Sequence, residues 1–254
     1  MRVHVAFHPL VVTAEPQVCI VVDVIRASTT LVTMVERGAG RIYVAETVDA
    51  ARRAAARMDG AILAGEENGL PPAGFHYGNS PVEVARAAFG AAPVIFVTTN
   101  GTAAIRRVAK APVVLVGALR NARAAARQAA ELARVRGLPV TVVCAGREGG
   151  FGLDDAYTAG ALVDRLLEVE RSAELTDGSA AALRLYRGER DALALFRESA
   201  AGRNVIRLGL EEDVVYCARA DVSEVVPRLS REVHVLESVT SGHREDAGRG
   251  GGGQ

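Results

Sequence analysis

Four segments of this chain share one layout: a short apolar run, a polar turn, and then a helix-forming stretch. Short, fully apolar runs are typical of strands that are buried on both faces of a mainly parallel sheet. The turns after such strands gather at the carboxyl edge of an open α/β sheet, where ligands bind. The sequence therefore predicts one ligand site built from four turns. The segments are 18–30, 61–69, 94–102 and 140–150.

The alternation of apolar runs with alanine- and arginine-rich helical stretches continues from residue 2 to about 170. It predicts an α/β, three-layer αβα fold with a mainly parallel or mixed sheet, a layout that is compatible with two similar lobes. Strands are expected at 3–7, 18–22, 41–44, 61–64, 94–97, 113–116 and 140–144. Helices are expected at 29–37, 48–58, 81–88, 103–109, 122–136 and 155–170.

The rest of the chain has weaker signals. Ser80, Pro81 and Glu83 have the spacing of an N-cap, a first helical residue and a capping-box partner. Residues 177–199 read as two helical pieces around Gly188, whereas 204–210 leads into a strand or a helix at 211–218. A last strand is expected at 233–236. We expect a single domain over 1–238 and a disordered, glycine-rich tail over 239–254.

Composition narrows the class of protein. The chain has 254 residues, with 30 basic against 30 acidic side chains, so we expect no broad nucleic-acid-binding face. No apolar run approaches the ~20 residues that span a bilayer, and residues 1–6 have no signal-peptide architecture. We therefore expect a soluble, cytoplasmic protein without a membrane partner. The three cysteines are widely spaced and odd in number, which indicates neither a disulfide framework nor a zinc site.

The first turn combines an acid, a base and hydroxyls. Asp23 ends a buried strand, Arg26 follows three residues later, and Ser28 and Thr29 stand where a helix begins. Asp23 is a candidate ligand of a hard cation, Arg26 a candidate partner of a substrate anion, and the helix start a candidate phosphate site. An ordinary strand-to-helix junction, with a structural ion pair at Arg26, explains the same residues.

The second turn contributes Glu66 as a candidate metal ligand or general base, and a solvated acidic turn is the alternative. A long loop then runs to Asn79 and Ser80, and loops of this length inside a compact domain are usually functional or disordered. His76 in this loop fits a structural role better than a catalytic one.

The third and fourth turns are also rich in polar groups. The third turn is a candidate oxyanion cradle, because hydroxyls, an amide and a glycine follow one another there. A simple turn is the alternative. The residues are Thr98, Thr99, Asn100, Gly101 and Thr102. The fourth turn places Gly146 and Arg147 after a strand. Asp154 and Asp155 then open the next helix, where they are candidate metal ligands or, alternatively, acids that stabilise the helix start.

Familiar phosphate motifs are absent. There is no phosphate-binding G-x-x-x-x-G-K-[ST] loop and no dinucleotide-binding G-x-G-x-x-G after the first strand. A cysteine-phosphatase loop needs an arginine six positions after its cysteine. In this chain, the residue six positions after Cys144 is Gly150. Ile25 stands where a haloacid-dehalogenase-like phosphatase has its second aspartate.

In order along the chain, the turns resemble those of the 2-phosphosulfolactate phosphatase family, which is associated with coenzyme M biosynthesis. The matching stretches are 23–30, 65–66, 74–75, 78–81, 98–102, 144–146 with 154–155, and 204–227. The resemblance covers nearly everything except the tail. It implies a Mg²⁺-dependent hydrolase that converts 2-phospho-3-sulfolactate to 3-sulfolactate and phosphate, with a small anionic substrate.

Under this resemblance, Asp23, Glu66 and Asp154 are expected to hold Mg²⁺, and Asp155 to act with them on water. Arg26 and Arg147 would hold anionic oxygens. The substrate-binding set would be Ser28, Thr29, Asn79, Ser80, Thr98, Thr99, Asn100, Gly101, Thr102 and Gly146. Either a metal-activated water or an aspartyl-phosphate at Asp23 is compatible with these residues.

Other functions stay open at this point. A phosphatase of another 2-phosphorylated hydroxy acid keeps the chemistry and changes the substrate. A nucleotide-binding oxidoreductase and a non-catalytic anion-binding protein are alternatives from other classes, and the missing dinucleotide motif disfavours the former. The sequence is also compatible with a homo-oligomer.

Overall fold

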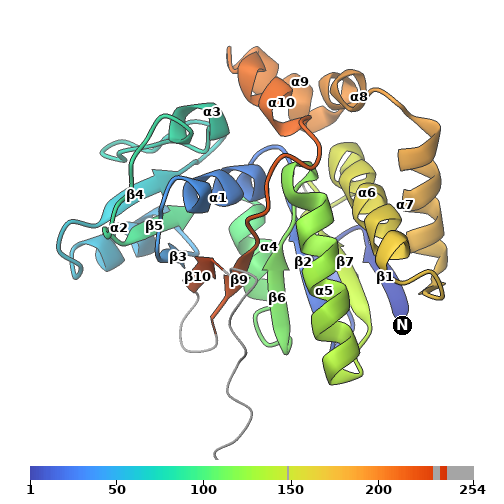
Figure 1. The fold of residues 1–254 in the computed structure, drawn as a ribbon. Coiled ribbons are helices and arrows are strands. Elements are labelled where there is room, and N and C mark those ends of the chain that lie inside the picture. Colours follow the sequence, from blue (N-terminus) through green and yellow to red (C-terminus); the bar gives the residue numbers. More distant parts are fainter. Residues whose placement is uncertain (148, 231–234, 239–254) are drawn as a thin grey trace, which may run out of the picture.

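The protein folds around one mixed sheet. The structure, a computed structural model, describes residues 1–147, 149–230 and 235–238 (Figure 1). The ten strands of the described residues pair in the order β4-β5-β3-β10-β9-β6-β2-β7-β1-β8. Their bounds are β1 Arg2–Ala6, β2 Val18–Val22, β3 Ile42–Val44, β4 Ile62–Gly65, β5 Val94–Val97, β6 Val113–Val116, β7 Val140–Cys144, β8 Glu174–Leu175, β9 Pro227–Leu229 and β10 Val235–Ser238.

Helices cover both faces of this sheet, which gives the three layers expected for an α/β chain. Along β2, Ile20 packs toward α5 and α6, whereas its neighbour Val21 packs toward α1 and α4. At the other end, Ile95 of β5 packs toward α2. The helices are α1 Ala27–Glu36, α2 Val48–Ala55, α3 Pro81–Val84, α4 Gly101–Arg107, α5 Ala122–Arg136, α6 Leu153–Val169, α7 Asp177–Gly188, α8 Ala192–Glu198, α9 Ala200–Arg207 and α10 Glu211–Cys217.

The sheet consists of two parallel groups joined by antiparallel strands. One group is β4-β5-β3 and the other is β6-β2-β7-β1-β8, with β10 and β9 between them. Because three antiparallel pairings separate β3 from β6, the two groups run in opposite senses along the sheet. Residues that follow β2, β4 and β5, from both groups, nevertheless line one cavity.

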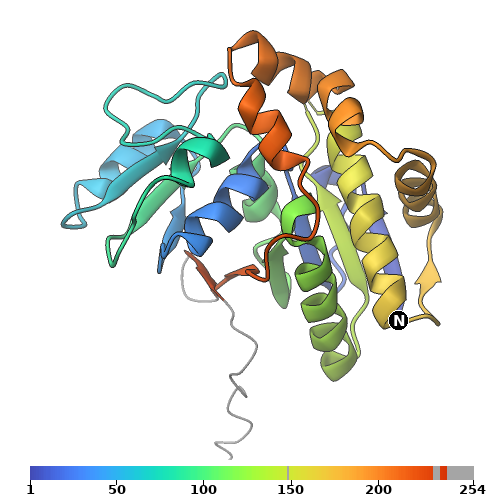
Figure 2. The same cartoon turned by 45° about the horizontal axis from the view of Figure 1, so that its top comes forward.

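Three short helices bridge the two groups. Helices α8, α9 and α10 lie above the strand ends, between α6 and α3 (Figures 1 and 2). Helix α10 contacts α3 and α9, and α6 contacts both α8 and α9. This helical bridge closes the space over the carboxyl ends of β2, β4 and β5.

Most predicted elements are confirmed. The strands expected at 18–22, 94–97, 113–116 and 140–144 and the helix expected at 122–136 have the predicted bounds. The other strands and three of the other helices begin or end one or two residues away from the predicted positions. Differences of this size are usual, because the ends of helices and strands are not sharply defined. The two helical pieces around Gly188 are α7 and α8, and 211–218, which sequence left open, is the helix α10.

Some predictions were wrong in detail. The helices expected at 48–58 and 81–88 end at Ala55 and Val84, because the next residues make shorter i→i+3 bonds. Ser80 caps α3 as predicted, but Glu83 accepts from the Gly78 N–H and not from Ser80. The short strands β8 and β9 were missed. The first residues of the strand expected at 233–236 and the tail from 239 lie outside the described residues.

No helix in the described part of the chain is both long enough and apolar enough to cross a membrane.

Candidate active site

The four predicted turns open into one cavity. It measures about 440 Å³ and lies beneath the helical bridge. Asp23 comes from the end of β2, Glu66 from β4, Thr99 from β5 and Arg147 from β7. The full lining is Asp23, Ile25, Arg26, Glu66, Asn68, Gly69, Asn79, Thr99, Asn100, Arg147, Ala201, Asn204 and Val205. The predicted convergence of the turns is therefore confirmed.

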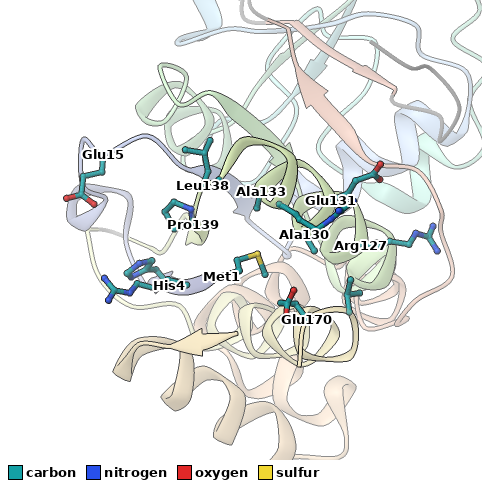
Figure 3. A pocket seen from close by; sticks show the side chains of 14 residues that line it. Met1, His4, Glu15, Arg127, Ala130, Glu131, Ala133, Leu138, Pro139 and Glu170 are labelled. Carbon is teal, nitrogen blue, oxygen red and sulfur yellow. The ribbon is translucent and has the colours of Figure 1, made fainter. Parts of the chain in front are cut away.

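Figure 3 shows a larger cavity of about 730 Å³, which shares no lining residue with the first. It is formed by the start of β1, the loop before β2, α5 and the end of α6. Acidic and basic side chains alternate around it, and its Arg2 and Arg127 are paired with Glu174 and Glu224. This lining favours neither an anion nor a cation, and none of the predicted site residues belongs to it.

Acidic side chains crowd the β2–β7 side of the site. Burial, followed by the negative charges of Asp154 and Glu66, raises the pKa of Asp23 to about 7. Burial also raises the pKa of Asp154 to about 6, and the pKa of Asp155 is raised by burial and by its two acidic neighbours. Asp154 and Asp155 are both buried and do not line the cavity themselves. This cluster is under electrostatic strain that a cation would relieve.

Asp155 also connects two turns. Its Oδ1 accepts a hydrogen bond from the Val24 N–H at 2.9 Å, and its Oδ2 accepts one from the Gly146 N–H at 3.0 Å. Gly146 has a φ of 68°, and a side chain there would collide with the Gly150 carbonyl. The carboxylate therefore fixes the ends of β2 and β7 relative to each other.

Glu66 has the same bracing role on the β4–β5 side. Its Oε1 accepts from the Thr99 N–H and its Oε2 from the Gly69 N–H, both at 2.7 Å. Charge-assisted bonds to backbone N–H groups of this length are strong and fix the acceptor's orientation. The prediction of Glu66 as a metal ligand stays a prediction, while its present contacts hold two turns together.

Arg26 is held at both ends of its guanidinium group. Nη1 donates to Asp213 Oδ2 at 2.9 Å, and Nη2 donates to the Gly69 carbonyl at 2.7 Å. Arg26 and Asp213 are only 4% and 2% exposed. Arg26 therefore forms a structural ion pair. It also lines the cavity, and its pairing with a substrate anion stays a prediction.

The carboxamide of Asn79 is a candidate ligand contact. Asn79 is buried and lines the cavity, yet its side-chain oxygen Oδ1 has no hydrogen-bond partner in the described residues. A buried carbonyl oxygen without a partner is costly to the fold, and such exceptions are found at functional sites. Its position among Arg26, Thr99 and Arg147 around the cavity suits a polar ligand.

Several predicted substrate contacts are used within the protein. Ser28 accepts from the Asp23 N–H, and Thr29 donates to the Val24 carbonyl. Ser80 donates to Asp213. Thr98 and Thr102 bond to each other's backbone. Because these groups and the Gly146 N–H already have partners and lie outside the lining, Asn79, Thr99 and Asn100 are the predicted contacts that face the cavity.

Gly101 serves packing between the turns. A Cβ atom there would lie 2.5 Å from the Ala27 Cβ and 2.8 Å from Asp23 Oδ2. Glycine therefore lets α4 approach α1 closely beside the Asp23 carboxylate.

Sequence reasoning missed residues that reach the site from distant segments. Asn68 and Gly69 were inside a predicted turn, and Asn204 of α9 began the matching stretch 204–227, but none of the three was given a role. His76 is structural as predicted, because its Nδ1 accepts from the Leu63 N–H of the edge strand β4. No periodic pattern marks Asn204, since it reaches the cavity only through the helical bridge.

The acidic cluster forms no closed metal site in the described part of the chain. Within the described residues, no three His, Cys, Asp or Glu side chains converge to hold a metal ion, so Asp23, Glu66 and Asp154 do not form a closed triad. Mg²⁺ is usually bound by one or two carboxylates together with waters and substrate phosphate. Asp23 lines the cavity and Asp154 is its buried acidic neighbour, so their oxygens match that mode, and Asn79 Oδ1 is a further oxygen at the cavity.

Fold and site together define an α/β enzyme with a polar, partly acidic cavity at converging strand ends. The 2-phosphosulpholactate phosphatase family profile matches residues 8–232, and the chain belongs to this family. Its members are phosphoric monoester hydrolases, so the resemblance seen in the sequence and the predicted enzyme class are confirmed.

Relatives agree with this assignment. A "Probable 2-phosphosulfolactate phosphatase" of Thermus thermophilus is 42% identical over 92% of this chain and 96% of its own length. Proteins of the same name from Deinococcus radiodurans and Symbiobacterium thermophilum are 41% and 36% identical, over 84% and 87% of this chain and 88% and 94% of their own lengths.

Proposed function

We propose that the chain hydrolyses 2-phospho-3-sulfolactate to 3-sulfolactate and phosphate, with Mg²⁺ as its cofactor. The observation that carries this proposal is the buried cluster of Asp23, Asp154 and Asp155 beside Arg26 and Arg147. Carboxylates and arginines at one place meet the needs of a hard cation and of a substrate with several anionic groups. The names of the relatives support this substrate.

Each side of the cavity has its own proposed role. Asp23 and Asp154 would hold Mg²⁺, which supplies charge neutralisation for the phosphoryl group when it is bound. Arg26 and Arg147 line the cavity and would bind anionic oxygens, as guanidinium groups do with phosphate and sulfonate. Asn79, Thr99 and Asn100 would hydrogen-bond the rest of the substrate. Glu66 and Asp155 keep the turns in register through their backbone contacts.

We assign the attack on phosphorus to a water molecule, with a carboxylate of the acidic cluster accepting its proton. The competing route makes Asp23 the nucleophile and forms an aspartyl-phosphate. Rapid quenching of the reaction followed by borohydride reduction separates the two routes. The water route leaves residue 23 unmodified, whereas the covalent route converts it to homoserine, which peptide mass spectrometry detects.

The activity is tested by measuring phosphate release from racemic 2-phospho-3-sulfolactate, phospholactate and phosphoglycolate, with Mg²⁺ and then with EDTA. Mass spectrometry of the organic product identifies 3-sulfolactate. We expect metal-dependent turnover that is fastest on the sulfonated ester. Equal or faster turnover of the simpler acids would assign the enzyme to another 2-phosphorylated hydroxy acid. No release from any ester by the folded, Mg²⁺-loaded protein would contradict a catalytic function.

A further inference from the structure

Asp213 joins three separate parts of the site. It lies on α10, and its Oδ2 accepts from Arg26 Nη1 at 2.9 Å. Its Oδ1 accepts from the Ser80 hydroxyl at 2.6 Å, close to the Val82 N–H at 3.4 Å. One buried carboxylate thus contacts the turn after β2, the start of α3 and the helical bridge. Asp213 belongs to the bridge itself, and its side chain hydrogen-bonds the other two parts.

The contacts of Asp213 determine where Arg26 points. The guanidinium group is fixed between Asp213 and the Gly69 carbonyl, and three of its five N–H groups have no protein partner in the described residues. Arg26 lines the cavity, so these N–H groups remain for a ligand. Without the Asp213 charge, the buried guanidinium would lose its counter-ion and its fixed orientation.

The same contacts position the helical bridge. Helix α10 packs on α9, and α9 supplies Ala201, Asn204 and Val205 to the cavity wall. Leu208, just after α9, approaches Gly69 so closely that a Cβ atom on that glycine would lie 2.6 Å from the leucine side chain. Asp213 ties α10 to Arg26 and Ser80, and it is a buried charged contact of this helix.

We propose that Asp213 is a positioning residue for substrate binding: it aligns Arg26 toward the anionic substrate and holds α9 and α10 over the cavity. This rests on the proposed phosphatase function. Interactions that bind substrate and transition state equally change KM more than kcat. Asp213 is therefore expected to control KM.

The test compares Asp213→Asn with Glu211→Gln, since Glu211 is on the same helix and pairs with Arg197 at the surface, where both side chains are about half exposed. Asp213→Asn should raise KM for 2-phospho-3-sulfolactate by roughly ten-fold or more, with kcat changed less than about three-fold. Glu211→Gln should leave both constants unchanged. Equal KM values for Asp213→Asn and the wild type would overturn the proposal.

A second variant separates positioning from simple stabilisation. Arg26→Gln combined with Asp213→Asn removes both buried charges, so the unpaired guanidinium no longer destabilises the fold. We expect its melting temperature to recover relative to Asp213→Asn while KM stays high. Recovery of the wild-type KM together with the melting temperature would show a purely structural role and overturn the proposal.

Hydrogen exchange gives a readout that does not depend on turnover. Amides of α9 and α10 should exchange faster in Asp213→Asn than in the wild type or Glu211→Gln, whereas amides of α5 should be unchanged. If the wild type hydrolyses none of the esters, the proposed function fails, and this comparison still decides whether Asp213 holds the bridge. Unchanged exchange in α9 and α10 would overturn that part of the proposal.

Discussion

The two sides of the cavity use buried carboxylates in opposite ways. On the β4–β5 side, both oxygens of Glu66 accept short hydrogen bonds from backbone N–H groups. On the β2–β7 side, the pKa of Asp23 is raised by burial and by its acidic neighbours. Because satisfied carboxylates stabilise a fold and crowded ones destabilise it, the difference separates a scaffold side from a reactive side. Asp155 has both characters, since it braces two turns and belongs to the crowded cluster.

The sharpest way to break this comparison is to remove the Asp23 charge. Asp23→Asn should lower kcat by about 10³-fold or more, the order seen when a catalytic electrostatic group is lost. Its melting temperature at pH 8 should rise, because a repelled buried charge disappears. Asp49→Asn, at an exposed surface pair with Arg52, is the control that should change neither. An active Asp23→Asn enzyme would contradict the assignment of the reactive side.

The pH dependence of stability sharpens the same comparison. The pKa values of Asp23 and Asp154 are raised from 3.8 to about 7 and about 6, so the folded state keeps protons that the unfolded state has lost. The free energy of unfolding should therefore fall as pH rises from about 4 to 7 and then level off. Each unit by which a carboxyl pKa is raised in the folded state contributes about 1.4 kcal/mol to this fall. Urea titrations across this range measure it, with Asp23→Asn flattening the slope. A slope unaffected by that substitution would contradict the prediction.

The scaffold side should respond in the opposite direction. In Glu66→Gln, an amide N–H₂ replaces one acceptor oxygen and faces a backbone N–H group. We expect a loss of about 2–3 kcal/mol in the free energy of unfolding, by denaturant titration, with a smaller loss of kcat than in Asp23→Asn. Glu67→Gln is the matched control, because Glu67 is the exposed neighbour. If the two glutamate variants were equally stable, Glu66 would not be a brace.

The contact between α4 and α1 should give the smallest effect. Gly101→Ala places a methyl group against the Ala27 Cβ and Asp23 Oδ2 and should cost about 1–2 kcal/mol in thermal or denaturant unfolding. Gly40→Ala is the control, since no atom lies within 4 Å of the Cβ position there. Equal stability of both variants would show that the approach of the two helices relaxes freely.

Sequence patterns predicted the sheet better than its connections. Strands such as β2 and β7 are continuous apolar runs buried on both faces, so local pattern and tertiary burial agree. The short strands β8 and β9 depend on partners that local pattern does not contain. The opposite senses of the two parallel groups follow from β9 and β10, and no turn signal indicates that arrangement.

The site shows the same limit. Asp23, Arg26 and Arg147 were predicted because each follows a strand, and all three line the cavity. The roles of the remaining groups depend on contacts across the chain, such as the pairing of Arg26 with Asp213, which are 187 positions apart. Hydroxyls such as that of Ser80 were assigned to substrate under the family resemblance, whereas in the structure the Ser80 hydroxyl donates to Asp213.

The most direct test of the two-sided account is calorimetric titration of Mg²⁺ in saturating inorganic phosphate, using the wild type, Asp23→Asn, Glu66→Gln and Glu67→Gln. We expect binding to be lost in Asp23→Asn and kept within about ten-fold of the wild type in Glu66→Gln, since one lost ligand charge outweighs an indirect shift of a turn. Normal binding by Asp23→Asn together with its loss in Glu66→Gln would contradict the account and place the metal on the β4–β5 side.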